Sequence, residues 1–434
     1  MKTEPESNPR LVIEKIVYPG RRLARVDGQV YFTDEGLPGE TVEIEILRTH
    51  ASFIEARTTA VLVPSPLRVA PRCGHYRVCG AYQTMPYPEQ LAAKQAQLLE
   101  MVKAGGISIS SEPEIIPSPT VWGYRNRIRF SLVRRDQKAS LAYHEPGSRD
   151  SHVEIGGCFL ATDSAGALAD AVRDAINQRD TENLDGIEIR ESLEEKAALL
   201  NLFWKKRRSV GEIDAILSAV RTRFSLAGVV SWTPERNGRT AETLEWGRGS
   251  IREKVGRMIL EFGPGSFFQV NSAILPRVIE DLVGAAGLCG TETVADIYGG
   301  VGTFGLALAE KAKRVHIVES FPANIRFLQA NVGTNDFQNI SICEGTAEDW
   351  LPLLAGRGLD LAIVDPPRKG LAREVVRALL KNPIAKILYL SCNPTTLIRD
   401  LGLLGERYRV ENLRLYDFFP QTPHIETLAV LIRR

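Results

Sequence analysis

Short runs of alternating hydrophobic and polar residues, separated by turn residues, make up the first 63 positions of the chain. The alternation is strict at positions 42–46, where the sequence reads Val-Glu-Ile-Glu-Ile. A period of two places alternate side chains on one face of a β-strand, so each run is expected to bury one face. Glycine and proline residues between the runs supply the turns. Four or five such strands in so short a segment predict a small β-barrel of the OB type over residues 1–64.

The last part of the chain has a different pattern, in which apolar runs of strand length alternate with segments of helical period. The first of these strands is expected at residues 293–297 and is followed by a helix at 304–311. Regular alternation of this kind predicts an α/β domain with a Rossmann-like, doubly wound and largely parallel sheet over residues 263–434.

The segment between these two regions, residues 65–262, has a mixed α+β pattern and is predicted to form a central domain. It contains a helical run at residues 88–104, whose apolar positions are spaced by three and four. Residues from about 90 to 120 are interpreted as a segment that docks on the last domain.

Composition and charge narrow the class of protein. The chain has 434 residues, of which 44% are hydrophobic and 25% charged, and its formal net charge is +1. These values are typical of folded globular proteins and exclude a disordered chain or a globally basic nucleic-acid binder. No apolar run has the roughly 18 residues of a membrane span, and the first ten residues lack a signal-peptide core. We expect a cytoplasmic protein with no membrane partner, and no feature indicates an obligate protein partner.

A glycine-rich turn follows the first predicted strand of the last domain. Gly300 and Gly302 lie in the segment 296–304, where they let the backbone turn tightly and approach a ligand. Glu319 ends the next predicted strand, about 20 residues further on, where a carboxylate accepts the hydroxyls of a ribose. The spacing indicates an adenosine ligand but does not distinguish NAD from S-adenosylmethionine.

Two further motifs favour S-adenosylmethionine. The sequence Asp-Pro-Pro-Arg-Lys-Gly at 365–370 and the sequence Leu-Ser-Cys-Asn-Pro at 390–394 each follow a predicted strand. Ligands of open parallel sheets bind at the carboxyl ends of the strands, so both motifs are expected beside the glycine turn. A dehydrogenase has no use for a cysteine and a proline-framed aspartate there, whereas a methyltransferase that acts on a nucleobase does.

Methylation of uracil at C5 explains the residue types. C5 is a weak nucleophile, and addition of a thiolate at C6 makes it enolate-like, so that one difficult step becomes two easier ones. Cys392 is the candidate thiol, and Asp365 is the candidate acceptor for the N3–H of uracil, a hydrogen that cytosine lacks. Glu426 opens an apolar strand, where burial would raise its pKa toward that of a useful base for removing the C5 proton.

These motifs together resemble the RNA uracil-5-methyltransferase family, especially the subgroup with an N-terminal TRAM domain that modifies 23S ribosomal RNA. The resemblance covers nearly the whole chain and is densest in the last 170 residues. Segment 267–271 (Phe-Phe-Gln-Val-Asn) is similar to the family's Phe-x-Gln-x-Asn motif. Segment 391–394 is similar to its nucleophile motif, and segment 418–426 to its terminal signature.

The resemblance implies a 5-methyluridine-forming transferase of class 2.1.1 that uses S-adenosyl-L-methionine, with Cys392 as nucleophile and Glu426 as base. His424 lies in the terminal signature, where a structural hydrogen bond is expected of it. The positions matching the cofactor and uracil pocket are Phe267, Gln269, Tyr298, Gly300, Gly302, Thr303, Glu319 and Asp365.

The family's iron–sulfur motif is incomplete in this chain. Members with a 4Fe-4S cluster use Cys-x5-Cys-x2-Cys and a distant fourth cysteine, which Cys73, Cys79 and Cys158 match, but Tyr82 occupies the third position. Such clusters ordinarily take four thiolates. A cluster on three thiolates and a degenerate remnant both remain open.

Basic residues in the central segment indicate an RNA partner. Residues 121–149 contain seven basic and two acidic residues, and Arg125, Arg127 and Arg129 alternate, so that on a strand they would share a face. The segment 203–208 (Phe-Trp-Lys-Lys-Arg-Arg) joins aromatic and basic residues. Such patches bind phosphates and stack unpaired bases. The expected substrate is 23S rRNA with a flipped or looped uridine.

Three alternatives remain open. A tRNA uracil-5-methyltransferase would carry the same catalytic motifs. A non-catalytic RNA-binding protein or chaperone would retain the fold without needing Cys392 and Glu426. An amino-group methyltransferase of the Asn-Pro-Pro-aromatic type is disfavoured, because Asp365 stands where that motif has asparagine.

Overall fold

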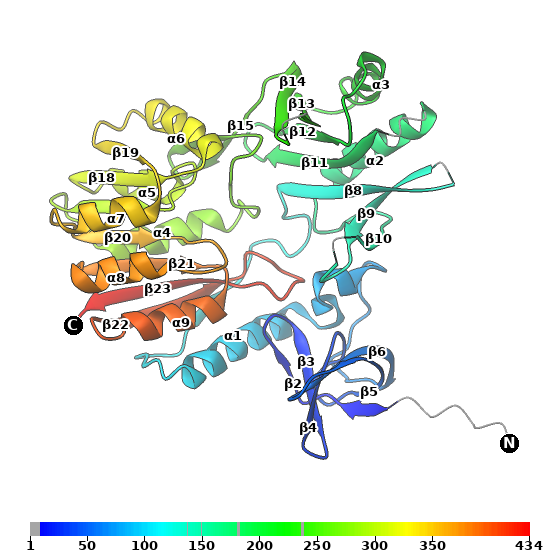
Figure 1. The fold of residues 1–434 in the computed structure, drawn as a ribbon, viewed down its shortest axis with the longest axis horizontal. Coiled ribbons are helices and arrows are strands. Elements are labelled where there is room, and N and C mark those ends of the chain that lie inside the picture. Colours follow the sequence, from blue (N-terminus) through cyan, green and yellow to red (C-terminus); the bar gives the residue numbers. More distant parts are fainter. Residues whose placement is uncertain (1–8, 137, 149, 180–182, 236–237) are drawn as a thin grey trace.

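The computed structural model describes residues 9–136, 138–148, 150–179, 183–235 and 238–434. The start of the predicted N-terminal barrel, residues 1–8, and Arg149 of the predicted basic segment lie outside them. Figure 1 shows the chain as an eight-stranded sheet with helices at the left, a seven-stranded sheet at the upper right and a small barrel at the lower right. Among the helices described, none is long and apolar enough to span a membrane.

The N-terminal barrel is a six-stranded sheet with the order β1-β5-β6-β4-β3-β2. Its core contains Leu11, Ile13, Ala24, Val42 and Ile44. The alternation at residues 42–46 therefore predicted the inward face of β5 at Val42 and Ile44, but Ile46 is 46% exposed, because the strand extends beyond the core there. Its strands are β1 (Arg10–Val12), β2 (Lys15–Val17), β3 (Arg21–Val26), β4 (Gln29–Thr33), β5 (Thr41–Thr49) and β6 (Ile54–Val63).

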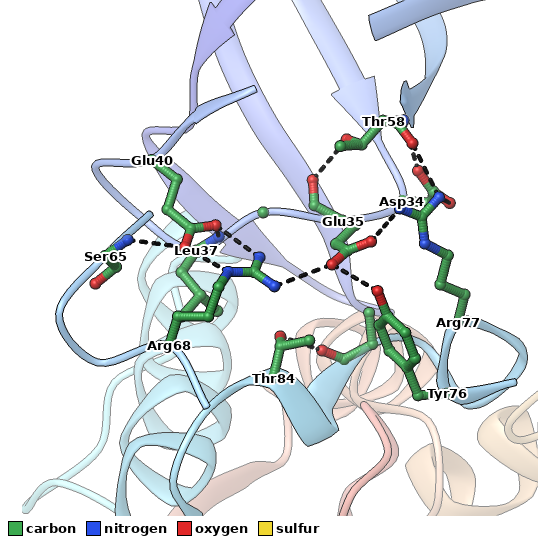
Figure 2. A network of polar contacts seen from close by, with 12 residues as sticks. Asp34, Glu35, Leu37, Glu40, Thr58, Ser65, Arg68, Tyr76, Arg77 and Thr84 are labelled. Carbon is green, nitrogen blue, oxygen red and sulfur yellow. Dashed lines mark hydrogen bonds and ion pairs between the residues drawn. The ribbon is translucent and has the colours of Figure 1, made fainter. Parts of the chain in front are cut away.

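The segment after the barrel folds back onto it through a network of buried charges (Figure 2). Glu40 is fully buried and its carboxylate accepts two hydrogen bonds of 2.7 Å from the guanidinium of Arg68. Glu35 is 2% exposed and pairs with Arg68 and Arg77, and the Tyr76 hydroxyl donates to it at 2.8 Å. These contacts join the barrel to Arg68 and to the 3-10 helix η1 (Tyr76–Cys79), which a second 3-10 helix, η2 (Tyr82–Thr84), follows.

The middle of the chain forms a seven-stranded sheet with the order β10-β9-β8-β11-β12-β13-β14. Two helices cover one of its faces, and their apolar residues share a core with Ile128, Phe130 and Leu200 from the strands. The elements are β8 (Arg127–Arg135), β9 (Lys138–His144), β10 (His152–Glu154), α2 (Asp163–Gln178), β11 (Leu184–Ser192), β12 (Ala197–Trp204), α3 (Val210–Val220), β13 (Leu226–Pro234) and β14 (Thr240–Gly247).

The C-terminal part is an eight-stranded sheet with the order β19-β18-β17-β20-β21-β23-β22-β7. Strands β17 to β21 are parallel, and β23 runs antiparallel to both β21 and β22. Its strands are β17 (Thr293–Ile297), β18 (Arg314–Glu319), β19 (Ile340–Glu344), β20 (Leu361–Val364), β21 (Lys386–Ser391), β22 (Tyr408–Tyr416) and β23 (Glu426–Arg433). The hairpin β15 (Ile251–Val255) and β16 (Met258–Phe262) precedes it.

Helices cover both faces of this sheet, as expected for a doubly wound fold. One core contains residues of α4 (Leu275–Ala286), α5 (Thr303–Ala309) and α6 (Pro322–Thr334). The other contains residues of α1 (Tyr87–Ala104), α7 (Ala347–Ala355), α8 (Arg373–Lys381) and α9 (Pro394–Leu404).

Two early elements lie with the C-terminal sheet. Strand β7 (Glu114–Ile116) pairs in parallel with β22, and α1 packs against α9. The division of the chain into three domains at residues 64 and 262 stays a prediction.

Candidate active site

The carboxyl ends of β17, β18, β20 and β21 meet at one edge of the sheet because these strands are parallel and adjacent. The glycine turn follows β17, and its geometry explains its residues. Gly302 has a φ of +95°, and a Cβ built there would lie 2.3 Å from the side chain of Leu306. A Cβ on Gly300 would meet no atom within 4 Å, so open space lies beside the turn.

Glu319 lies beside the glycine turn, as the spacing predicted. Its carboxylate accepts hydrogen bonds from the backbone N–H of Gly300 at 2.9 Å, of Ser320 at 2.6 Å and of Phe321 at 2.7 Å. The side-chain amide of Asn324 donates a fourth at 3.0 Å. These donors fix the orientation of the carboxylate at the end of β18.

Two buried aspartates lie behind and beside the turn. Burial raises the pKa of Asp296 to about 7, although its Oδ2 accepts from the N–H of Gly305 at 2.7 Å. Its Oδ1 is buried and has no hydrogen-bond partner among the described residues. Asp365 follows β20, and burial together with the charge of Asp296 raises its pKa as well.

Cys392 and Glu426 face each other at the ends of adjacent strands. Ser391 on β21 pairs with Thr427 on β23, so the antiparallel register places Cys392 opposite Glu426 at the next position. Burial raises the pKa of Cys392 to about 11, and the charges of Glu426 and Asp365 act in the same direction. Burial and the nearby Asp365 raise the pKa of Glu426 well above its usual range.

Two residues near this pair were not predicted from the sequence. Arg368 follows Asp365 in the same motif, and its positive charge lowers the pKa values of Cys392 and Glu426. The Asp-Pro-Pro-Arg motif contained this signal. Tyr18 comes from the N-terminal barrel, and no local sequence pattern could have placed it here.

Tyr18 is half-buried against the core that contains α1 and α9. Burial raises the pKa of its phenol to about 12, and the charges of Arg368, Cys392 and Glu426 also act on it. Two residues further on, a Cβ built on Gly20 would lie 2.8 Å from the side chain of Pro423, in the loop that leads to Glu426. The turn between β2 and β3 therefore packs against the candidate active site.

The loop 263–271, which includes the predicted Phe-x-Gln-x-Asn motif, connects the parts of the site. The backbone N–H of Phe267 donates to the Asn324 side chain at 2.9 Å, and its ring is 50% exposed. The Asn271 amide donates to the carbonyl of Phe418 at 3.2 Å. Gln269 and Thr303 are both 8% exposed.

The two remaining predicted residues of the site are aromatic. Tyr298 is half-buried directly after β17 and has a φ of +70°, and burial raises the pKa of its phenol. His424 packs edge-on against Phe419, at 5.8 Å between ring centroids. Its Nδ1 is buried without a partner among the described residues, so the structural hydrogen bond expected of it is not made at this nitrogen. Burial lowers the pKa of His424 to about 4, which keeps the ring neutral at pH 7.

Of the two possibilities that the sequence left open, the structure does not support an iron–sulfur cluster. The described residues contain no group of three or more His, Cys, Asp or Glu that would hold a metal ion. Tyr82, at the third ligand position, is fully buried, and its hydroxyl accepts from the Gln97 amide at 2.8 Å. The Sγ of Cys73 is hydrogen-bonded to Gln83, and burial raises the pKa of the Cys79 thiol to about 11. Cys158 lies near both.

The three alternating arginines point to different neighbours. Arg129 is exposed, with its guanidinium 3.9 Å from the centroid of the Phe203 ring, whereas Arg127 is paired with Glu188 at 2.8 Å. Arg125 precedes β8, lies over Tyr124 and is close to Cys79. Arg127 and Arg129 lie on β8, whereas Arg125 precedes the strand, so the RNA-binding role expected of the three stays a prediction.

The largely parallel sheet with helices on both faces defines an α/β protein of the doubly wound class. The glycine turn at the carboxyl edge of its strands is of the kind that binds nucleosides. The family model described as tRNA (uracil-5-)-methyltransferase matches residues 86–434, and the chain belongs to this family. The predictions of the family, and of an RNA (uracil-5-)-methyltransferase as the enzyme class, are confirmed.

Similar proteins agree with this assignment. A Lactobacillus johnsonii protein described as an uncharacterized RNA methyltransferase is 29% identical over 446 residues, covering 98% of each chain. One from Synechocystis sp. is 30% identical and covers 97% of this chain and 95% of its own length. The crystal structure of the Pyrococcus abyssi tRNA (uracil-54, C5)-methyltransferase in complex with S-adenosyl-L-homocysteine has a TM-score of 0.77 at 24% identity, covering 98% of this chain and 100% of that chain. This likeness confirms the predicted fold class.

Proposed function

We propose that this protein forms 5-methyluridine in RNA by transient covalent bonding of Cys392 to the uracil ring. The observation that carries the proposal is the register of β21 and β23, which sets a thiol opposite a buried carboxylate beside the glycine turn. A nucleophile and a base that act on adjacent carbons of one ring need this proximity.

The residues present fit S-adenosyl-L-methionine. Open space lies beside Gly300, and the buried Oδ1 of Asp296 has no partner among the described residues, so a donor on the ligand would satisfy it. Glu319, already oriented by four donors, would share its carboxylate with a ribose. Gln269, Tyr298, Gly302 and Thr303 are proposed to line the same site. When bound, the cofactor supplies an electrophilic methyl group and a positive charge.

The chain's own groups account for the remaining steps. The Cys392 thiolate attacks C6 of the uracil, and the electron pair of the C5–C6 double bond moves toward O4. The carboxylate of Asp365 accepts the N3–H and holds the ring edge. After C5 has taken the methyl group, Glu426 removes the C5 proton, the double bond re-forms and the bond between sulfur and C6 breaks. A base with a pKa raised above the usual range of Glu suits this proton transfer near neutral pH.

Covalent trapping tests this mechanism. Fluorine at C5 has no proton to lose, so RNA containing 5-fluorouridine is expected to accumulate as a protein–RNA adduct when S-adenosylmethionine is present. Cys392→Ala should abolish the adduct, and Cys343→Ala, which changes a buried cysteine on β19, should not. Glu426→Gln is expected to accumulate adduct on unmodified RNA. An adduct that persists in Cys392→Ala would refute the assignment.

The RNA target is proposed to be 23S rRNA with the uridine flipped or looped out of its stack. Cys392 is half-buried directly after β21, where a base that stays stacked in a helix would not reach it. The ribosomal choice rests on the N-terminal barrel, which lies outside the matched residues 86–434, and on the incomplete cysteine motif of Cys73, Cys79 and Cys158. The structurally similar Pyrococcus protein is named for tRNA, which favours tRNA as the second candidate.

Mapping 5-methyluridine distinguishes these substrates. Total RNA from a strain lacking the gene should lose one 5-methyluridine in 23S rRNA and keep its tRNA pattern. Loss confined to tRNA would establish the second candidate. If the Cys392→Ala protein reverses every effect of deleting the gene, the protein acts instead as a non-catalytic RNA-binding protein or chaperone. The cytoplasmic location expected from the sequence stays a prediction.

A further inference from the structure

The two faces of the seven-stranded sheet differ in what covers them. Helices α2 and α3 bury the face that carries Ile128 and Phe130. On the other face, Leu199 and Val230 pack into the core of the C-terminal sheet. This core does not cover the ends of β12 and β13. Two residues beyond Val230, Trp232 on β13 lies opposite Phe203 on β12.

A row of flat side chains crosses this open part of the sheet. The guanidinium of Arg129 lies 3.9 Å from the centroid of the Phe203 ring. The rings of Phe203 and Trp232 are nearly parallel, with 6.1 Å between centroids and an angle of 9°. On the intervening strand β11, Gly186 pairs with Phe203 and carries no side chain. The indole N–H of Trp232 donates to Asn201 at 3.1 Å and fixes the ring.

The row borders a hollow of about 860 Å³ on the same sheet. This volume is within the range of roughly 300–1,000 Å³ that is typical of small-molecule clefts. Both polar and apolar residues line it, and Ser131 is hydrogen-bonded to His144 at 3.3 Å. The lining includes Arg129, Ser131, His144, His152, Asp185 and Lys205.

The other end of the row reaches the loop of the candidate active site. A Cβ built on Gly265 would lie 3.5 Å from the Trp232 ring. Arg190 holds this loop by donating to the carbonyls of Gly263 and Ser266, both at 2.8 Å. Phe267 follows directly and is 50% exposed.

We propose that this open face, defined by Arg129, Phe203 and Trp232 and called the stacking row below, binds unpaired RNA nucleotides next to the target uridine. The proposal rests on the function proposed above and adds the surface that holds the flanking strand. Bases stack on the guanidinium plane of Arg129, which the Phe203 ring supports, and on the ring of Trp232, as they do on arginine and aromatic side chains that bind single strands. The hollow takes the next nucleotide away from the catalytic edge.

Charge favours a nucleic acid over a protein at this surface. Arg127 is neutralised by Glu188, but among the described residues no carboxylate forms an ion pair with Arg129. Its guanidinium lies flat on Phe203 with its donors free for a phosphate. A flat row of two rings and a guanidinium offers π-faces of the kind that any base stacks on.

Binding of a labelled oligouridylate of about 12 nucleotides to the full-length protein tests the proposal. Phe203→Ala and Trp232→Ala are each expected to weaken binding roughly 5- to 100-fold, the range for loss of one base stack. Phe224→Ala is the matched control, since Arg223 also lies over this ring, at 5.6 Å, but on the helix-covered side. It should bind within twofold of the wild type at equal folded fraction. Equal losses in all three variants, or none in the first two, would overturn the proposal.

Two further measurements separate stacking from a loss of folding and from the catalytic proposal. Trp232→Phe keeps a ring, so it should recover most of the affinity of Trp232→Ala, and the quenching of tryptophan emission by bound RNA should fall. If bound RNA quenches the tryptophan emission of Trp232→Phe as strongly as that of the wild type, no base stacks on Trp232 and the proposal is overturned. At saturating RNA, Trp232→Ala should still form the 5-fluorouridine adduct with a raised KM. If the wild-type protein forms no adduct, the proposed function is contradicted. The oligouridylate measurements would still show whether the stacking row binds RNA.

Discussion

Lys94 on α1 and Asp417, directly after β22, form an ion pair of 2.6 Å in which both side chains are fully buried. Lys94 also donates to the carbonyl of Phe419 at 3.1 Å. On the same helix, the Gln90 side chain accepts from the backbone N–H of Gln421 at 2.9 Å and donates to its side chain at 2.8 Å. Helix α1 therefore holds the start of the loop that ends at Glu426.

Lys94→Met is expected to destabilise the protein by about 3–5 kcal/mol, because it leaves the Asp417 carboxylate buried without its partner. Denaturant unfolding measures the effect. Lys15→Met is the control, since Lys15 and Glu100 are paired at 2.8 Å with side chains 40% and 54% exposed. Its cost should be within about 1 kcal/mol. Equal costs for the two variants would contradict the role given to the buried pair.

The reactivity of Cys392 should rise steeply with pH. Its pKa is raised to about 11, chiefly by burial, so the thiolate fraction of the free protein should grow about tenfold per pH unit between pH 7 and 10. Alkylation by iodoacetamide, followed by peptide mass spectrometry, measures this rate.

Arg368→Gln should slow that alkylation several-fold at pH 8, because removal of a positive charge raises the pKa of the Cys392 thiol further. Exposed Cys289 in the same sample is the internal control and should react at an unchanged rate. Faster alkylation of Cys392 in Arg368→Gln would show that the guanidinium does not act on the thiol.

Gly302→Ala should abolish measurable binding of S-adenosyl-L-homocysteine in calorimetry. Its φ of +95° disfavours any side chain, and the added Cβ would lie 2.3 Å from Leu306 and 2.7 Å from Leu328. Gly284→Ala on α4 is the control, because a Cβ there meets no atom within 4 Å and alanine favours a helix by about 1 kcal/mol. Unchanged affinity of Gly302→Ala for S-adenosyl-L-homocysteine would show that the cofactor does not bind at this turn.

Arg68→Met is expected to cost about 3 kcal/mol of stability, because Glu40 loses both of its charged donors while fully buried. Arg25→Met removes an exposed pair with Glu14 on the same barrel and should cost less than about 1 kcal/mol. Denaturant unfolding curves give the loss of stability in each variant. A larger loss in Arg68→Met than in Arg25→Met supports the network shown in Figure 2. A reversed order would contradict it.

Local periodicity predicted the regular elements well. The strand expected at residues 293–297 is β17 with the same bounds, and the helical run at 88–104 is α1 from Tyr87 to Ala104. Both periods are properties of neighbouring residues. The apolar pattern did not predict that α1 also buries Gln90, Lys94 and Gln97 beside Leu98 and Val102. The spacing of motifs along parallel strands also predicted that the glycine turn and Glu319 would meet, because strand order fixes their edge.

Contacts between distant segments could not be predicted in this way. Tyr18 and Cys392 are 374 residues apart, and their proximity depends on how the barrel packs against α1. The alternation predicted that Arg125, Arg127 and Arg129 stand between buried residues, but not that Arg125 forms an isolated bridge with the distant Ala161 before the strand begins.

The close approach of Gly20 to Pro423 means that the barrel is not an interchangeable attachment. Any foreign module fused at residue 64 would need a residue without a side chain at the tip of its turn, and an aromatic ring two places earlier, to close the wall beside Cys392 and Glu426. The turn at residues 18–20 and the loop before Glu426 therefore constrain each other, and an exchange of N-terminal modules between relatives would have to carry the matching proline loop with it.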